Sequence, residues 1–160
     1  MKDTLGTGAV NAAELRHMSG LEFVQALIDG RLPSPPMATT LSFRLVEADE
    51  GRAVFTGEPS TEFYNPIGSV HGGWAATVLD SCMGCAVQTT LPAGVGYTTL
   101  EFKIDLVRAI TGGTGPVRGE GRVIKSGRRV ALADGELRDG EGRLLARGTT
   151  TCLVFEYPGG

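Results

Sequence analysis

The stretch Asn65-Pro-Ile-Gly-Ser-Val-His-Gly-Gly-Trp-Ala-Ala-Thr-Val-Leu-Asp80 joins a polar, glycine-rich turn directly to an apolar segment. The apolar segment predicts a long helix over about residues 73–90. Asp80 is the only side chain between Glu62 and Glu101 that is fully charged at neutral pH. Because carboxylates are rarely buried unless they are paired or used, Asp80 is a candidate functional group. The alternative places it on a solvated edge of the helix or against a backbone amide.

The rest of the chain predicts one short helix before this stretch and six strands on either side of it. Ser19-Gly-Leu-Glu22 has the spacing of a capping box and opens an amphipathic helix that ends at Gly30. Alternating apolar residues and polar turns predict the strands at 37–46, 53–58, 97–108, 117–125, 128–138 and 143–155. Residues 47–52 are expected to form a polar turn, and the last three strands an antiparallel meander.

A single apolar helix without helical neighbours must pack against the sheet. We therefore expect an α+β fold, in which one curved antiparallel sheet wraps around one long central helix and leaves its edge strands open. Residues 19–157 are expected to form this single domain, and residues 1–18 a partly ordered N-terminal arm.

Composition narrows the classes of function. The chain has 160 residues and a net charge of −3, and no basic stripe with interleaved aromatic residues that would favour nucleic acid. No segment has the roughly 18 uninterrupted apolar residues of a membrane span, and no leader pattern is seen, so we expect a cytoplasmic protein. Three cysteines, without a second Cys or His pair, favour buried reduced thiols over a metal or redox site.

Gly72 and Gly73 precede the predicted helix, where exposed backbone amides at its positive end could polarise a carbonyl oxygen. The alternative is an ordinary tight turn. Gly72 and Asp80 are eight residues apart, which on a helix is roughly 12 Å with a rotation of about 80°. One carbonyl can hardly reach both in one chain, so joint action requires an antiparallel second copy. This predicts a homodimer with two shared sites.

The segment 65–80, together with Gly96-Tyr-Thr-Thr-Leu-Glu-Phe-Lys-Ile104, resembles the hotdog-fold acyl-CoA thioesterases of the phenylacetate-degradation (PaaI-like) type. The similarity extends from about Leu21 to Phe155. It implies a curved sheet around a long helix, a working unit that is at least a dimer, and hydrolysis of an acyl-CoA thioester. The acyl group could be small, medium-chain or aryl.

The resemblance also implies roles for five residues. Asp80 matches the carboxylate that activates water or attacks the thioester, and Gly72 matches the amide donor to the carbonyl oxygen. Asn65 matches an amide side chain that holds the carbonyl or the water, and His71 matches a motif histidine with a structural role. Thr99 matches a hydroxyl that orients the nucleophile, but strict alternation puts it on the face away from Leu100 and Phe102, so a bulge or a partner subunit is required.

The turn Lys125-Ser-Gly-Arg-Arg129 offers three cations to the phosphates of coenzyme A, with Arg128 and Arg129 as the candidates. A solvated hairpin is the alternative. Gly73 is a further candidate for substrate binding. A carboxylate, a water and amide donors suffice for thioester hydrolysis, so we expect neither a metal nor a separate cofactor. Whether the dimers pair into tetramers is open.

Two other functions fit the same fold. A hotdog hydratase or dehydratase would use a His with a carboxylate, for which His71 and Asp80 are nine positions apart. A non-catalytic acyl-CoA sensor would usually carry a DNA-binding segment, whereas residues 1–36 predict one short helix. Trp74, Met83, Phe63 and Tyr64 could line an acyl pocket or belong to the core.

Overall fold

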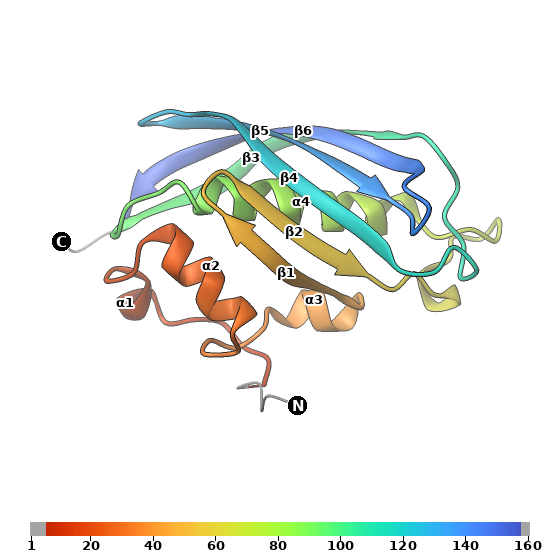
Figure 1. The fold of residues 1–160 in the computed structure, drawn as a ribbon, viewed down its shortest axis with the longest axis horizontal. Helices are drawn as coiled ribbons and strands as arrows, with labels where there is room; N and C mark the ends of the chain where they lie inside the picture. The colour runs from red at the N-terminus through yellow and green to blue at the C-terminus, as the bar shows by residue number, and fades with distance from the viewer. Residues whose placement is uncertain (1–5, 158–160) are drawn as a thin grey trace.

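The computed structural model describes residues 6–157 and consists of one antiparallel sheet arched over one long helix (Figure 1). The strands are β1 (Phe43–Asp49), β2 (Arg52–Gly57), β3 (Val95–Leu106), β4 (Val117–Ser126), β5 (Val130–Arg138) and β6 (Leu144–Glu156). Their order in the sheet is β1-β2-β4-β5-β6-β3. The expected α+β hotdog architecture is therefore confirmed, including the β4-β5-β6 meander and the open edges at β1 and β3.

The central helix α4 (Gly72–Gln88) packs its apolar residues against the concave face of the sheet. Trp74, Val78, Leu79, Cys82 and Met83 are all at most 3% exposed. Trp74 and Met83 therefore belong to the core rather than to a solvent-open acyl pocket. The Trp74 indole N–H donates to the Leu41 carbonyl at 2.8 Å, which satisfies the polar atom of this buried ring.

Close approach of α4 to the sheet depends on glycine in the middle strands. A Cβ atom on Gly121 of β4 would lie 2.3 Å from the Cys82 carbonyl oxygen, and one on Gly119 would lie 2.7 Å from Cys82 Sγ. Because real Cβ atoms do not approach other atoms so closely, a side chain here would push the helix off the sheet. These two positions bring α4 into backbone contact with β4 and set the depth of the core.

The N-terminal part forms helices α1 (Ala12–Leu15), α2 (Gly20–Ile28) and α3 (Pro36–Thr40), which lie on the β1 side of the molecule (Figure 1). The predicted capping box is present, because Ser19 Oγ accepts from Glu22 N–H and the Glu22 carboxylate accepts from Ser19 N–H. In the expected N-terminal arm, residues 1–5 lie outside the described residues. Thr7 forms a β-bridge with Ser34.

Two boundaries near β1 differ from the sequence prediction. The strand expected over 37–46 is wrong in its first half, where Pro36 at the first helical position starts α3 and Ala38 supplies its buried contact. Ser42, with φ of 53°, then turns the chain into β1. The polar turn expected over 47–52 is also wrong, because β1 continues to Asp49.

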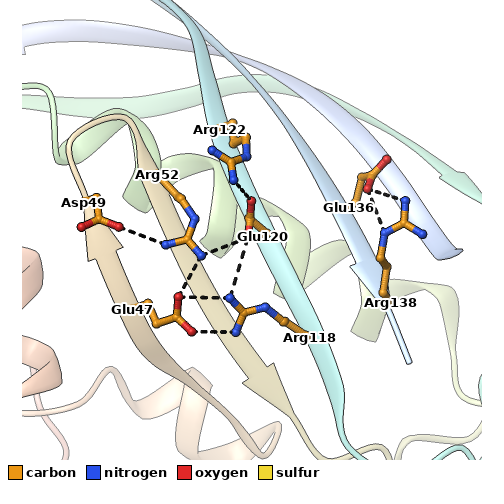
Figure 2. Close-up of polar contacts among 8 residues, drawn as sticks. All are labelled: Glu47, Asp49, Arg52, Arg118, Glu120, Arg122, Glu136 and Arg138. Carbon is orange, nitrogen blue, oxygen red and sulfur yellow. Dashed lines mark hydrogen bonds and ion pairs between the residues drawn. The ribbon is translucent and has the colours of Figure 1, made fainter. Parts of the chain in front are cut away.

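The reason for the second error is visible on the outer face of the sheet, where charged residues pair across strands (Figure 2). The Glu47 carboxylate accepts from both Arg118 Nη1 and Arg52 Nη2 at 2.8 Å. Glu120 accepts from Arg52 Nη2 at 3.1 Å and also pairs with Arg122. Side chains that look like a solvated turn in the sequence are thus a cross-strand ion cluster that covers β1, β2 and β4.

Candidate active site

Asp80 lies in the middle of α4, half-buried, with its carboxylate directed to the edge strand β3. Its Oδ1 accepts a hydrogen bond from Thr99 Oγ1 at 3.0 Å. Within residues 6–157, no Lys, Arg or His is paired with it. Burial raises the pKa of Asp80 and the Thr99 hydrogen bond partly offsets that rise, so the pKa lies above its ordinary value. A carboxylate held in this way is basic for an aspartate and has oxygen lone pairs left for a substrate or a water.

A bulge in β3 gives Thr99 its orientation. Thr99 pairs with Cys152 of β6 and Glu101 pairs with the neighbouring Thr151, so Leu100 is an extra residue between them. Phe102 then pairs with Thr150, two positions from Cys152 on the same buried face of β6. Thr99 and Phe102 therefore share a face although they are three residues apart, which simple alternation forbids.

The turn before α4 is closed by the side chain of Asn65. Its Oδ1 accepts from the backbone N–H of Ile67 at 3.1 Å and of Ser69 at 3.3 Å, and its Nδ2 donates to Ser69 Oγ at 3.0 Å. Within residues 6–157 the second Nδ2 proton donates no hydrogen bond. Asn65 thus fixes the loop and has one donor left for a ligand.

His71 and the two glycines form the first turn of α4. His71 is the N-cap, and its Nδ1 accepts from Gly73 N–H at 2.9 Å. That bond occupies the Gly73 amide, whereas the Gly72 N–H makes no hydrogen bond within the described residues. Of the two amides, Gly72 is therefore the one available to a carbonyl oxygen at the positive end of the helix.

A cavity of about 200 Å³ lies at this turn, and three of the predicted residues, Asn65, His71 and Gly72, line it together. Leu106, at the end of β3, forms part of its wall, and a Cβ on Gly72 would lie 2.5 Å from Leu106 Cδ1. The Leu106 side chain is 60% exposed. No signal in the sequence indicated its place in the cavity, because the contact joins two distant segments.

The structure brings the predicted residues together in two groups. Asp80 and Thr99 form one group, and Asn65, His71 and Gly72 form the other. The group with Asn65 lies at the first turn of α4, and the group with Asp80 lies at its middle. Because α4 is continuous from Gly72 through Asp80, eight residues, or roughly 12 Å, separate Gly72 from Asp80. The two groups do not meet in one chain. His71 is likewise too far along the helix from Asp80 to act with it in the same chain.

Arg128 and Arg129 lie apart from both groups, at the hairpin between β4 and β5. They line a cavity of about 490 Å³ together with Leu91, Pro92 and other residues beyond the C-terminal end of α4. Within residues 6–157 neither arginine side chain forms an ion pair, so both guanidinium groups are available to a phosphate group.

Among residues 6–157 no three His, Cys, Asp or Glu side chains are placed to hold a metal ion together. None of the helices described is long and apolar enough to cross a membrane. The three cysteines are free, and burial raises the pKa of Cys85 to about 12.

Known proteins share this fold and part of the sequence. A family model of the thioesterase superfamily matches residues 67–146. A candidate esterase of Saccharolobus solfataricus is 30% identical over 107 residues, covering 67% of this chain and 74% of that protein. The name of this relative and the description of the family model both indicate hydrolysis of an ester or thioester.

Solved structures give the same result. A structure from Ralstonia eutropha JMP134, described as a candidate thioesterase related to phenylacetic acid degradation, has 30% identity and a TM-score of 0.74, covering 82% of this chain and 98% of that one. The Escherichia coli PaaI protein of the phenylacetic acid degradation operon has the same fold, with a TM-score of 0.74 at 20% identity, covering 91% and 97%. The family model spans half of the chain, from the turn at Ile67 through α4 to the start of β6, and the chain belongs to the thioesterase superfamily.

Proposed function

We propose that this thioester hydrolase acts on acyl-CoA, with Asp80 as the catalytic carboxylate and the Gly72 amide as the donor to the thioester oxygen. The observation that carries the proposal is the environment of Asp80. Asp80 is a half-buried carboxylate with a raised pKa, and within the described residues it accepts a hydrogen bond from the Thr99 hydroxyl. Such a group can take a proton from water or attack a carbonyl carbon itself.

In the general-base route, Asp80 removes a proton from a water molecule as the water oxygen attacks the thioester carbon. The negative charge that develops on the carbonyl oxygen is stabilised by the Gly72 N–H and the positive end of α4. The carbon–sulfur bond then breaks and the CoA thiolate leaves. In the nucleophilic route, Asp80 forms a mixed anhydride that water hydrolyses. Thr99 holds the carboxylate in place in both.

We further propose that each site is shared by two copies of the chain. Strand β3 is a twelve-residue edge strand, and its side chains Leu100, Phe102 and Leu106 are 57%, 43% and 60% exposed. A long apolar edge is a strong candidate for pairing with another copy. A two-fold axis between Phe102 and Lys103 of β3 would bring Thr99 of one copy toward Leu106 of the other. Asp80, bonded to Thr99, would then approach Gly72, which contacts Leu106.

The coenzyme A nucleotide is proposed to bind at the β4–β5 hairpin, where Arg128 and Arg129 line a cavity of about 490 Å³. Gly73 supports the site through its bond to His71, and Asn65 offers its remaining Nδ2 proton to the carbonyl or the water. The relative from Ralstonia eutropha, named for phenylacetic acid degradation, suggests aryl thioesters as the first substrates to test. The working unit would be a homodimer, or a tetramer built from two such dimers.

The test is a panel of short-chain, medium-chain and aryl acyl-CoA thioesters, in which release of free thiol is followed spectroscopically. We expect hydrolysis of at least one class, abolished by Asp80→Asn. A 3-hydroxyacyl-CoA is included, with enoyl absorbance as the readout for a hydratase. Absence of thiol release across the panel would contradict the proposal and favour a sensor that only binds acyl-CoA.

A further inference from the structure

We propose that Thr150 of β6 is a positioning residue for the reaction: its buried hydroxyl holds the β3 bulge in the form that directs Thr99 at Asp80. This inference rests on the proposed role of Asp80. Thr150 belongs neither to the turn before α4 nor to the helix itself, but lies in the middle of β6, the strand beside the edge strand β3.

The contact that supports this role joins a side chain of β6 to the backbone of β3. Thr150 Oγ1 donates a hydrogen bond to the backbone carbonyl of Glu101 at 2.9 Å, and Thr150 is 2% exposed. Glu101 is the first residue that pairs with β6 after the bulge at Leu100. A side-chain hydroxyl, rather than the ladder alone, thus ties the chain to β6 at the point where the strand returns to register.

The alternative strand geometry shows what this bond prevents. If Leu100 were absorbed into regular pairing, the residues before it would shift by one position relative to β6. In a strand a shift of one residue turns each side chain to the opposite face. Thr99 would then point away from α4, and Asp80 would lose the hydroxyl at 3.0 Å.

Removing the Thr150 hydroxyl would therefore act on the bulge in two ways. It would leave the Glu101 carbonyl, at a part-buried position, without this donor, which costs free energy. It would also remove the attachment that makes the bulged register preferable to the regular one. Both effects reach Asp80 through Thr99, so Thr150 needs no contact with substrate.

The neighbouring residue provides a matched control. Thr151 Oγ1 donates to the side-chain carboxylate of Glu101, on the opposite face of β6 from Thr150. This bond is exposed and involves no backbone atom of the bulge. Thr151→Val removes a hydroxyl of the same strand that also bonds to Glu101, but the Glu101 carbonyl keeps its bond from Thr150. We therefore expect the activity of this variant to match the wild type.

The experiment compares Thr150→Val, which keeps the shape, with Thr150→Ser, which keeps the hydroxyl, on a CoA thioester hydrolysed by the wild type. We expect the valine variant to lose about tenfold to a hundredfold in kcat/KM, the size expected when the Asp80 carboxylate loses its hydrogen bond from Thr99. The serine variant should restore most of this activity. The acid limb of the pH profile should move to higher pH in the valine variant, because the Thr99 bond lowers the pKa of Asp80. If the valine variant does not fold, Thr150→Cys, a weak donor, replaces it.

A double-mutant cycle with Thr99→Val separates positioning from a general loss of structure. If Thr150 acts through Thr99, the Thr99→Val, Thr150→Val double variant is no slower than Thr99→Val alone. Losses that add in full, or an unshifted acid limb in Thr150→Val, would overturn the inference. These results would leave the proposed function intact, whereas activity in Asp80→Asn would remove the proposed function itself.

Discussion

Thr99 Oγ1 donates to Asp80 Oδ1 at 3.0 Å, across the space between the edge strand and the central helix. The bond exists because β3 contains one extra residue, Leu100, that turns Thr99 to the helix side. The carboxylate is thereby oriented by a neutral donor, and no cation within residues 6–157 neutralises it. A group with this environment is suited to proton removal or attack, since its charge is not already compensated.

Asp80→Asn should reduce turnover by about a thousandfold or more while stabilising the fold at neutral pH. Burial raises the pKa of Asp80, so the folded state binds its proton more tightly than the unfolded chain does. The stability from this group is complete below the unfolded pKa and is lost as pH rises through the raised folded pKa. Thermal unfolding at pH 7 should show a higher Tm for the Asn variant, and the difference should disappear in acid. A lower Tm at pH 7 would contradict the assigned environment.

Gly121→Ala should destabilise the fold by about 3 kcal/mol, at the upper end for an overpacked core, because its Cβ would meet backbone atoms of Cys82 and Met83. Denaturant unfolding measures the loss. Gly140→Ala is the control, since no atom lies within 4 Å of its Cβ. Equal midpoints for the two variants would show that α4 lies farther from β4 than described.

Arg129→Ala and Arg128→Ala should each raise KM for an acyl-CoA by roughly fivefold, the size expected for one exposed ionic contact. KM for the matching N-acetylcysteamine thioester, which lacks the nucleotide, should not change. Arg122→Ala, on the outer face of the sheet, serves as the control. An equal effect of the hairpin variants on both substrates would place the nucleotide elsewhere.

Glu47→Gln should weaken the fold in a pH-dependent manner. Hydrogen bonds from Arg118 and Arg52 lower the pKa of Glu47 to about 2 (Figure 2). Its contribution is present above the unfolded pKa near 4.5 and is lost as pH falls toward 2. The Tm of the variant should fall below that of the wild type at pH 7 and approach it in acid or in high salt, and the effect is small because the pair is exposed. A Tm difference that does not depend on pH would contradict the ionic explanation.

The central helix and its two candidate sites were predictable from the sequence because each depends on residues close together in the chain. The apolar run predicts α4, and helix geometry alone separates Gly72 from Asp80. Spacing alone did not choose between Gly72 and Gly73; the family resemblance favoured Gly72, and the physical reason, that His71 accepts from the Gly73 amide, is visible only in the structure.

The features that the sequence did not predict come from contacts between distant segments. The position of the bulge at Leu100 is a property of the β3–β6 pairing; the alternating pattern of β3 gives no sign of it, and only the role implied for Thr99 required either a bulge or a partner subunit. The strand at Glu47 looks like a turn until Arg118, 71 residues later, is placed beside it. Helix α3 begins at Pro36, which the alternation of Leu41, Phe43 and Leu45 obscured.

The shared site depends on Gly72 and Asp80 coming from different copies, and this can be tested with two variants. Gly72→Pro removes the N–H at the first helical position, where proline is well accepted, and His71 before it has the extended ψ of 135° that proline requires. Gly72→Ala, which keeps the N–H, controls for the contact with Leu106. Loss of the amide should lower kcat by about a hundredfold to a thousandfold.

The most direct measurement is the activity of purified heterodimers that carry Asp80→Asn in one copy and Gly72→Pro in the other, isolated with two different affinity tags. If the sites are shared, one site carries both changes and the other carries neither. Shared sites therefore predict about half of the wild-type activity per dimer, although each homodimeric variant has lost nearly all of its activity. Heterodimers as inactive as their parents would contradict it, because Gly72 and Asp80 would then act on substrate within one chain or not together at all.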